Sequence, residues 1–81
     1  MKELTTIQEI VWTIILQHYE DYRIEPSRLE IAEKLEERSG KGFSKQAVSE
    51  HIAALIRKGY LKKIDHTVSR GQRGYALKRR A

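Results

Sequence analysis

A short stretch in the second half of the chain carries an amide, a hydroxyl, a carboxylate and a small methyl group within five residues. An amide can pair bidentately with adenine, a carboxylate can accept from cytosine N4, a hydroxyl can serve a base or a phosphate, and a methyl group can touch the methyl group of thymine. The residues that we predict to read base edges in this way are Gln46, Ala47, Ser49 and Glu50. An ion pair of Glu50 with Lys45 or Arg57 is the alternative for that carboxylate.

A second set of side chains suits contacts with phosphate or with a minor groove. Two serines, each followed by a cation, stand where helices are predicted to begin, and the free amides and dipole of a helix start attract phosphate. Two arginines beside glycines suit a narrow minor groove, where negative potential is concentrated. The set comprises Ser27, Arg28, Lys41, Ser44, Lys45, Arg70 and Arg73. The serines cap helices whether or not DNA binds, and the cations could instead be only solvated.

Three helices are predicted to position these side chains, over residues 5–22, 28–38 and 45–58, because apolar residues recur there at helical spacing. Ser27 with Glu30 has the pattern of a capping box. Ser44 is a favourable N-cap, with Phe43 before it and Val48 after it at the positions of a hydrophobic staple. Gly40 and Gly42 are predicted to end the second helix. The segment 45–58 is the predicted recognition helix, with Val48, Ile52 and Leu55 on its buried face.

After Gly59 the apolar period changes from helical towards two, which predicts strands over 60–65 and 75–79 joined by a wing loop over 66–74. Ile24, in the break before Pro26, could add one short strand. The order predicts a single domain over residues 1–81 that is mainly α with a small β-hairpin (α+β). This is a winged helix-turn-helix of three helices plus a two- to three-stranded antiparallel wing. A three-helix bundle with an accessory hairpin is the alternative.

Charge is sorted along the chain. Residues 1–40 hold five basic and nine acidic side chains, whereas residues 41–81 hold eleven basic and two acidic ones. A half with such an excess creates a directional field suited to a polyanion, although a soluble protein with a basic tail is the alternative. Because the basic half contains the predicted recognition helix and wing, double-stranded DNA is the predicted partner.

Several segments resemble the N-terminal DNA-binding domain of LexA-type repressors. They are Leu4-Thr5, residues 8–11, 26–35 and 50–59, and Ser69-Arg70-Gly71. The pattern Glu-His-x-x-Ala-Leu-x-Arg-Lys-Gly, which begins at Glu50, is the most specific of them. The resemblance implies a third helix in the major groove, with Gln46, Ala47, Ser49 and Glu50 at the positions that read bases in that family.

The sequence departs from that family in three respects. It has no counterpart of the C-terminal self-cleaving domain, which also dimerises those repressors, so self-cleavage is not expected of it. The residue types at the base-reading positions differ, and the wing is lengthened by Gln72-Arg73-Gly74-Tyr75. A damage-response operator does not follow from the resemblance.

The composition disfavours catalysis, metal binding and membrane insertion. A chain of 81 residues forms one small core without room for a second lobe around a substrate cleft. It has no Cys, and its three His are scattered, so no metal, no cofactor and no enzyme activity are predicted. Its apolar runs are far shorter than about 20 residues and it opens with no signal-peptide pattern, so a cytoplasmic, nucleoid-associated protein is expected.

The first predicted helix supports one alternative of a different class. Trp12 and Tyr19 widen its apolar surface beyond one stripe, so they either pack in the core or form a surface for a second copy or another protein. The main hypothesis is a sequence-specific, double-stranded DNA-binding transcriptional regulator. The alternative is a winged-helix interaction adaptor that docks through this helix on polymerase or another regulator.

Overall fold

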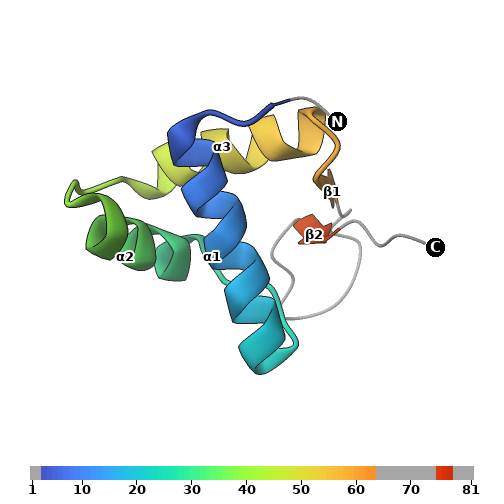
Figure 1. The fold of residues 1–81 in the computed structure, drawn as a ribbon, viewed down its shortest axis with the longest axis horizontal. Coiled ribbons are helices and arrows are strands. Elements are labelled where there is room, and N and C mark those ends of the chain that lie inside the picture. Colours follow the sequence, from blue (N-terminus) through green and yellow to red (C-terminus); the bar gives the residue numbers. More distant parts are fainter. Residues whose placement is uncertain (1–2, 64–74, 78–81) are drawn as a thin grey trace.

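The computed structural model describes residues 3–63 and 75–77. Three helices, α1 (Thr6–Tyr22), α2 (Arg28–Ser39) and α3 (Lys45–Arg57), are followed by the strands β1 (Leu61–Lys63) and β2 (Tyr75–Leu77). Figure 1 shows α1 running through the middle of the molecule, with α3 crossing one end of it and α2 beside it. The predicted fold class, three helices with a small antiparallel wing, is confirmed.

Each helix begins at a hydroxyl residue that satisfies backbone amides. Ser27 and Glu30 form the predicted capping box, and Ser44 accepts a hydrogen bond from an amide of the first turn of α3. Thr5 and Gln8 form a second capping box, with bonds of 3.1 and 3.2 Å, that we did not predict. Thr5 is therefore the cap of α1 and not its first residue, although Thr-x-x-Gln is a recognisable capping pattern.

The ends of α2 and α3 are set by glycines. Gly40 adopts φ 79°, so α2 extends through Ser39, one residue beyond the predicted end. Gly59 adopts φ 91° and donates to the carbonyl of Ile56, while Tyr60 donates to the carbonyl of Leu55. These two bonds form a Schellman motif, which ends α3 at Arg57, one residue earlier than predicted, and makes Tyr60 part of the turn instead of a strand.

The sheet of the described residues has two antiparallel strands, in which Lys62 lies opposite Ala76. Residues 64–65, 78–79 and the predicted wing loop 66–74 lie outside the described residues. The strand considered for Ile24 is wrong, because Ile24 lies in a bend. The carboxylate of the adjacent Glu25 accepts a hydrogen bond of 3.1 Å from the backbone amide of Leu77. A side chain, and not a third strand, therefore bonds to β2 at this point.

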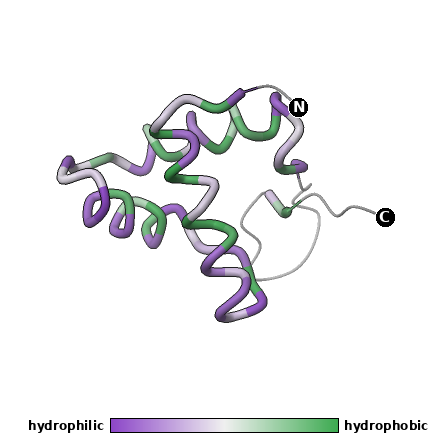
Figure 2. Tube along the Cα trace, viewed as in Figure 1, coloured by the Kyte–Doolittle hydropathy of each residue, from purple (hydrophilic) through white to green (hydrophobic). Residues whose placement is uncertain are grey.

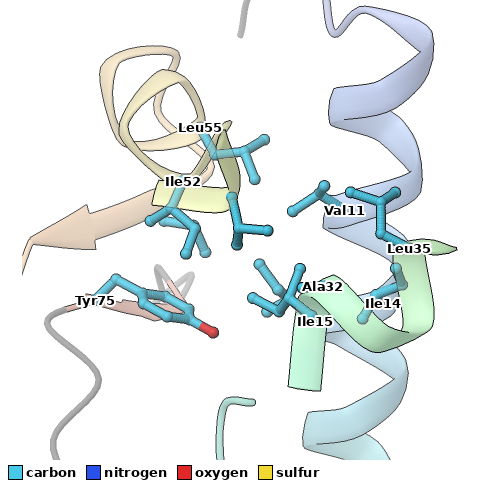
Figure 3. Close-up of a cluster of buried hydrophobic side chains, with 11 residues drawn as sticks. Val11, Ile14, Ile15, Ala32, Leu35, Ile52, Leu55 and Tyr75 are labelled. Atoms are coloured by element: carbon cyan, nitrogen blue, oxygen red, sulfur yellow. The ribbon is translucent and has the colours of Figure 1, made fainter. Parts of the chain in front are cut away.

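One hydrophobic core joins the three helices and the sheet. Figure 3 shows side chains of α1, α2 and α3 converging, with the Tyr75 ring entering from β2. In Figure 2 the apolar positions recur along each helix between polar ones, as one-sided packing requires. The buried core residues are Val11, Ile14, Ile15, Ile31, Ala32, Leu35, Val48, Ile52, Leu55, Leu61 and Tyr75. This core fixes α3 against α1 and α2 and leaves its other face outward.

Candidate nucleic-acid interface

α3 separates an apolar face from a polar one. Val48, Ile52 and Leu55 are buried against the core, as the sequence predicted, and Ala54, which was not predicted to be inside, is also buried. The exposed residues of α3 are Lys45, Gln46, Glu50, Ala53 and Arg57. The outward face is therefore polar, with one small residue in its middle that permits close approach of another surface.

The predicted base-reading residues are not equally accessible. Gln46 and Glu50 are exposed, whereas Ala47 and Ser49 are half-buried. Ala47 lies in the first turn, where its amide donates to the Ser44 hydroxyl at 3.1 Å. The four residues therefore lie in the first two turns of α3. Gln46 and Glu50 are exposed on its outward face, and Ala47 and Ser49 lie at the edge of that face.

A hydrogen bond joins the start of α2 to the second turn of α3. The Nε of Arg28 donates to the hydroxyl oxygen of Ser49 at 2.7 Å, across 21 residues of sequence. Sequence reasoning placed Arg28 on phosphate and Ser49 on a base and did not connect them. No local pattern could have shown this contact, because it depends on how α2 packs against α3.

The two capping serines keep a hydrogen available for an anion. In each, the hydroxyl oxygen accepts from a backbone amide of its own helix, Ser27 from Glu30 and Ser44 from Ala47. A hydroxyl that accepts in this way can still donate its hydrogen to a phosphate oxygen. Ser44 is exposed and Ser27 is half-buried, so both serines are placed at helix starts as predicted.

Basic side chains lie at the turn and on both ends of α3. Lys41 in the turn, Lys45 and Arg57 are all exposed. α3 has no acidic residue in its first turn, so the positive end of its dipole is not neutralised there. Among the described residues Glu50 forms no ion pair, so neither Lys45 nor Arg57 sequesters its carboxylate.

The wing strand β2 is tied to the loop that precedes α2. The Tyr75 hydroxyl donates to the carbonyl of Pro26 at 2.6 Å in the interior, and the Leu77 amide donates to Glu25. These bonds span 49 and 52 residues of sequence, and sequence reasoning missed both. The predicted wing contacts Arg70 and Arg73 lie outside the described residues.

The aromatic residues of α1 make contacts within the chain. Trp12 is half-buried against the core, and its ring meets Tyr60 edge to face, with centroids 5.2 Å apart. Tyr19 is also half-buried. The Trp12 and Tyr60 pair ties α1 to the turn after α3, and so contributes to holding α3 in place.

A separate groove of about 470 Å³ lies between the C-terminal half of α1 and α2. Its lining is of mixed charge and includes Asp21, Glu30, Glu33, Lys34 and Arg38. The three carboxylates disfavour a polyanion there, so this groove is not part of the interface. Within residues 3–63 and 75–77, no three His, Asp or Glu side chains come together as metal ligands, and no helix is both long and apolar enough to cross a bilayer.

Two helices joined by a short turn that begins with glycine, the second with a polar outward face, followed by an antiparallel two-stranded sheet, define a winged helix-turn-helix domain. The sequence matches the family described as the LexA DNA binding domain over residues 1–71. The chain therefore belongs to the LexA DNA-binding domain family.

Curated relatives agree with this assignment. The chain is 42% identical over 74 residues to a LexA repressor of Histophilus somni (strain 2336), an alignment that covers 90% of this chain and 32% of the relative. It is 38% identical over 73 residues to a LexA repressor of Actinobacillus pleuropneumoniae serotype 5b (strain L20), covering 89% of this chain and 31% of the relative. The chain thus spans about a third of the length of the curated relatives that it matches.

Proposed function

We propose that this chain is a sequence-specific, double-stranded DNA-binding transcriptional regulator in which α3 enters the major groove. The observation that carries the proposal is the outward face of α3, which is polar and basic at both ends and displays Gln46 and Glu50. These two side chains have the hydrogen-bonding groups that distinguish base pairs in the major groove. Membership of a DNA-binding family supports the same function.

The dimensions of α3 suit this role. A helix of 13 residues is about 20 Å long, and the major groove, about 12 Å wide, admits an α-helix. The starts of α2 and α3, with Ser27, Arg28, Ser44 and Lys45, would contact phosphates on either side and set the register of α3. The wing, with Arg70 and Arg73, would contact the backbone or the adjacent minor groove.

The direction of regulation that we propose is repression. The relatives at 42% and 38% identity are LexA repressors, and a domain that occupies an operator within a promoter excludes polymerase sterically. The proposal assigns binding and no catalysis to this chain. The test uses a reporter gene whose promoter contains the DNA motif that the chain binds, as identified by selection from a random pool. Expression of the reporter should fall when the chain is supplied, and unchanged or raised expression would argue against repression.

Selection of bound duplexes from a random pool tests sequence-specific binding directly. The chain should enrich one motif, and Gln46→Ala should lose preference at one position at a cost of about 1 to 3 kcal/mol. Gln17→Ala is the matched control, because Gln17 is an exposed glutamine on α1. If Gln46→Ala weakens binding to every sequence equally, Gln46 does not read a base.

A titration with random-sequence duplex at low salt separates this proposal from the adaptor hypothesis. The chain should bind such duplex, and Lys45→Gln should lower the slope of log affinity against log salt by about one, because one phosphate contact releases about one counterion. A chain that fails to bind any duplex at low salt would leave its basic half unexplained and favour an adaptor that docks through α1.

A further inference from the structure

The bond between Arg28 and Ser49 determines which role the Ser49 hydroxyl can play in DNA recognition. The Arg28 Nε lies 2.7 Å from the Ser49 oxygen, and both residues are half-buried, so the contact is partly shielded from water. The structure records no other hydrogen bond of the Ser49 side chain among the described residues. The hydroxyl hydrogen therefore has no acceptor among the described residues and can be donated to a ligand.

A serine hydroxyl that is free to rotate can donate to a base or accept from one. Accepting a charge-assisted bond from a guanidinium changes this, because the cation fixes the oxygen towards itself and turns the hydrogen away. A bond accepted from a cation also polarises the hydroxyl and strengthens its own donation. A second donor that approaches the same oxygen would be repelled by the charge of Arg28.

We propose that Arg28 is a positioning residue that makes Ser49 a hydrogen-bond donor towards DNA. Ser49 then disfavours cytosine at the position of the DNA site that it faces. In the major groove cytosine presents only the N4 amino donor, whereas guanine, adenine and thymine each present an acceptor. The inference rests on the proposed function, since it requires α3 in the major groove. It adds a specificity rule for one position, set by a residue on a different helix.

The test begins by locating the base that Ser49 faces. Random-pool selection with the parent chain and with Ser49→Ala should give motifs that differ at one position, at which the parent disfavours cytosine. Four duplexes that differ only at that position are then titrated. The parent should bind the cytosine duplex about tenfold more weakly than the best of the other three, and Ser49→Ala should bind all four alike. Ser49→Thr, which retains the hydroxyl, should retain the discrimination.

Arg28→Met is the decisive variant, because it keeps an apolar stem of similar length and removes the donor. We expect it to bind every duplex more weakly and also to lose the discrimination against cytosine, because the Ser49 hydroxyl can now rotate and accept. The double variant with Ser49→Ala should have the same base preference as Ser49→Ala alone. Thermal unfolding monitored by circular dichroism verifies that each variant is folded at the titration temperature. If Arg28→Met is unfolded, Arg28→Ala replaces it, because alanine also has no side-chain donor.

Three outcomes would overturn the inference. If Arg28→Met weakens binding but leaves the rejection of cytosine intact, Arg28 contacts phosphate without positioning Ser49. If Ser49→Ala leaves the motif unchanged, Ser49 does not read a base. If the parent binds no duplex even at low salt, the proposed function itself fails. The first two outcomes both require that the parent binds DNA, so a failure of the inference can be distinguished from a failure of the proposed function.

Discussion

Replacing Tyr75 by phenylalanine tests whether the wing is anchored to the start of α2. The Tyr75 hydroxyl donates to the Pro26 carbonyl at 2.6 Å, and the tyrosine is 2% exposed. Phenylalanine keeps the ring that packs in the core and removes only the hydroxyl. The substitution therefore removes the buried hydrogen bond to Pro26, which joins residues far apart in the sequence.

The expected cost follows from that burial. A typical intramolecular hydrogen bond contributes about 0.5 to 1.5 kcal/mol, and a buried acceptor that loses its partner costs about 1 to 3 kcal/mol. We therefore expect Tyr75→Phe to lower the free energy of unfolding by about 1.5 kcal/mol. For a domain of this size each kcal/mol corresponds to about 4 to 8 °C in Tm.

Urea unfolding followed by circular dichroism measures this change, with Tyr22→Phe as the matched control. Tyr22 is 67% exposed, so the loss of its hydroxyl should change the free energy of unfolding by less than about 0.5 kcal/mol. An unchanged m-value would show that the unfolding transition is the same in both variants. Equal effects of Tyr75→Phe and Tyr22→Phe would refute the anchoring role of the hydroxyl.

Three further pairs of substitutions test the helix ends and the core, each measured by urea unfolding. Arg23 ends α1 with φ 61°, a conformation that favours glycine, so Arg23→Gly should raise the free energy of unfolding by about 0.5 to 1 kcal/mol. The control is Arg38→Gly within α2, which should lower it by about 1 kcal/mol. A loss of stability in Arg23→Gly would contradict that conformation. Leu35 is fully buried, so Leu35→Ala should lower the free energy of unfolding by about 2 to 5 kcal/mol. Leu29 is 54% exposed, so Leu29→Ala should lower it by less than about 0.5 kcal/mol. Similar losses in the two variants would count against the core as described. Ser44→Ala should cost about 1 kcal/mol through the lost cap and Ser44→Gly only a few tenths, and no difference between them would remove the capping role.

The helices and the polarity of α3 could be predicted from the sequence because their signals are local. The Ser27 and Glu30 box, the Ser44 cap and the glycine at position 40 lie within a few residues of the ends that they set. The apolar spacing of Val48, Ile52 and Leu55 identified the buried face of α3 in the same way. The Thr5 and Gln8 box carried an equal local signal that was overlooked, whereas the positive φ of Arg23 carried none.

The contacts that orient the site could not be predicted, because each depends on the final packing of distant segments. The bonds of Arg28 to Ser49, Tyr75 to Pro26 and Leu77 to Glu25 span 21, 49 and 52 residues. In the sequence, an arginine on one helix and a serine on another could each contact solvent, phosphate or another side chain equally well. The identity of the partner is decided only when the core brings α2 and α3 together.

These long-range bonds form a connected series that runs from β2 to α3, the predicted recognition helix. β2 holds the Glu25 and Pro26 loop, this loop leads directly into the cap of α2, and Arg28 in the first turn of α2 holds Ser49 on α3. Phosphate contacts set the register of a DNA-binding protein, while base contacts specify its sequence. A connected set of this kind keeps the predicted phosphate contacts at the start of α2 in a fixed relation to the predicted base contacts on α3. A substitution in the wing, such as Tyr75→Phe, is therefore expected to weaken sequence discrimination as well as stability, although the Tyr75 side chain is buried in the core.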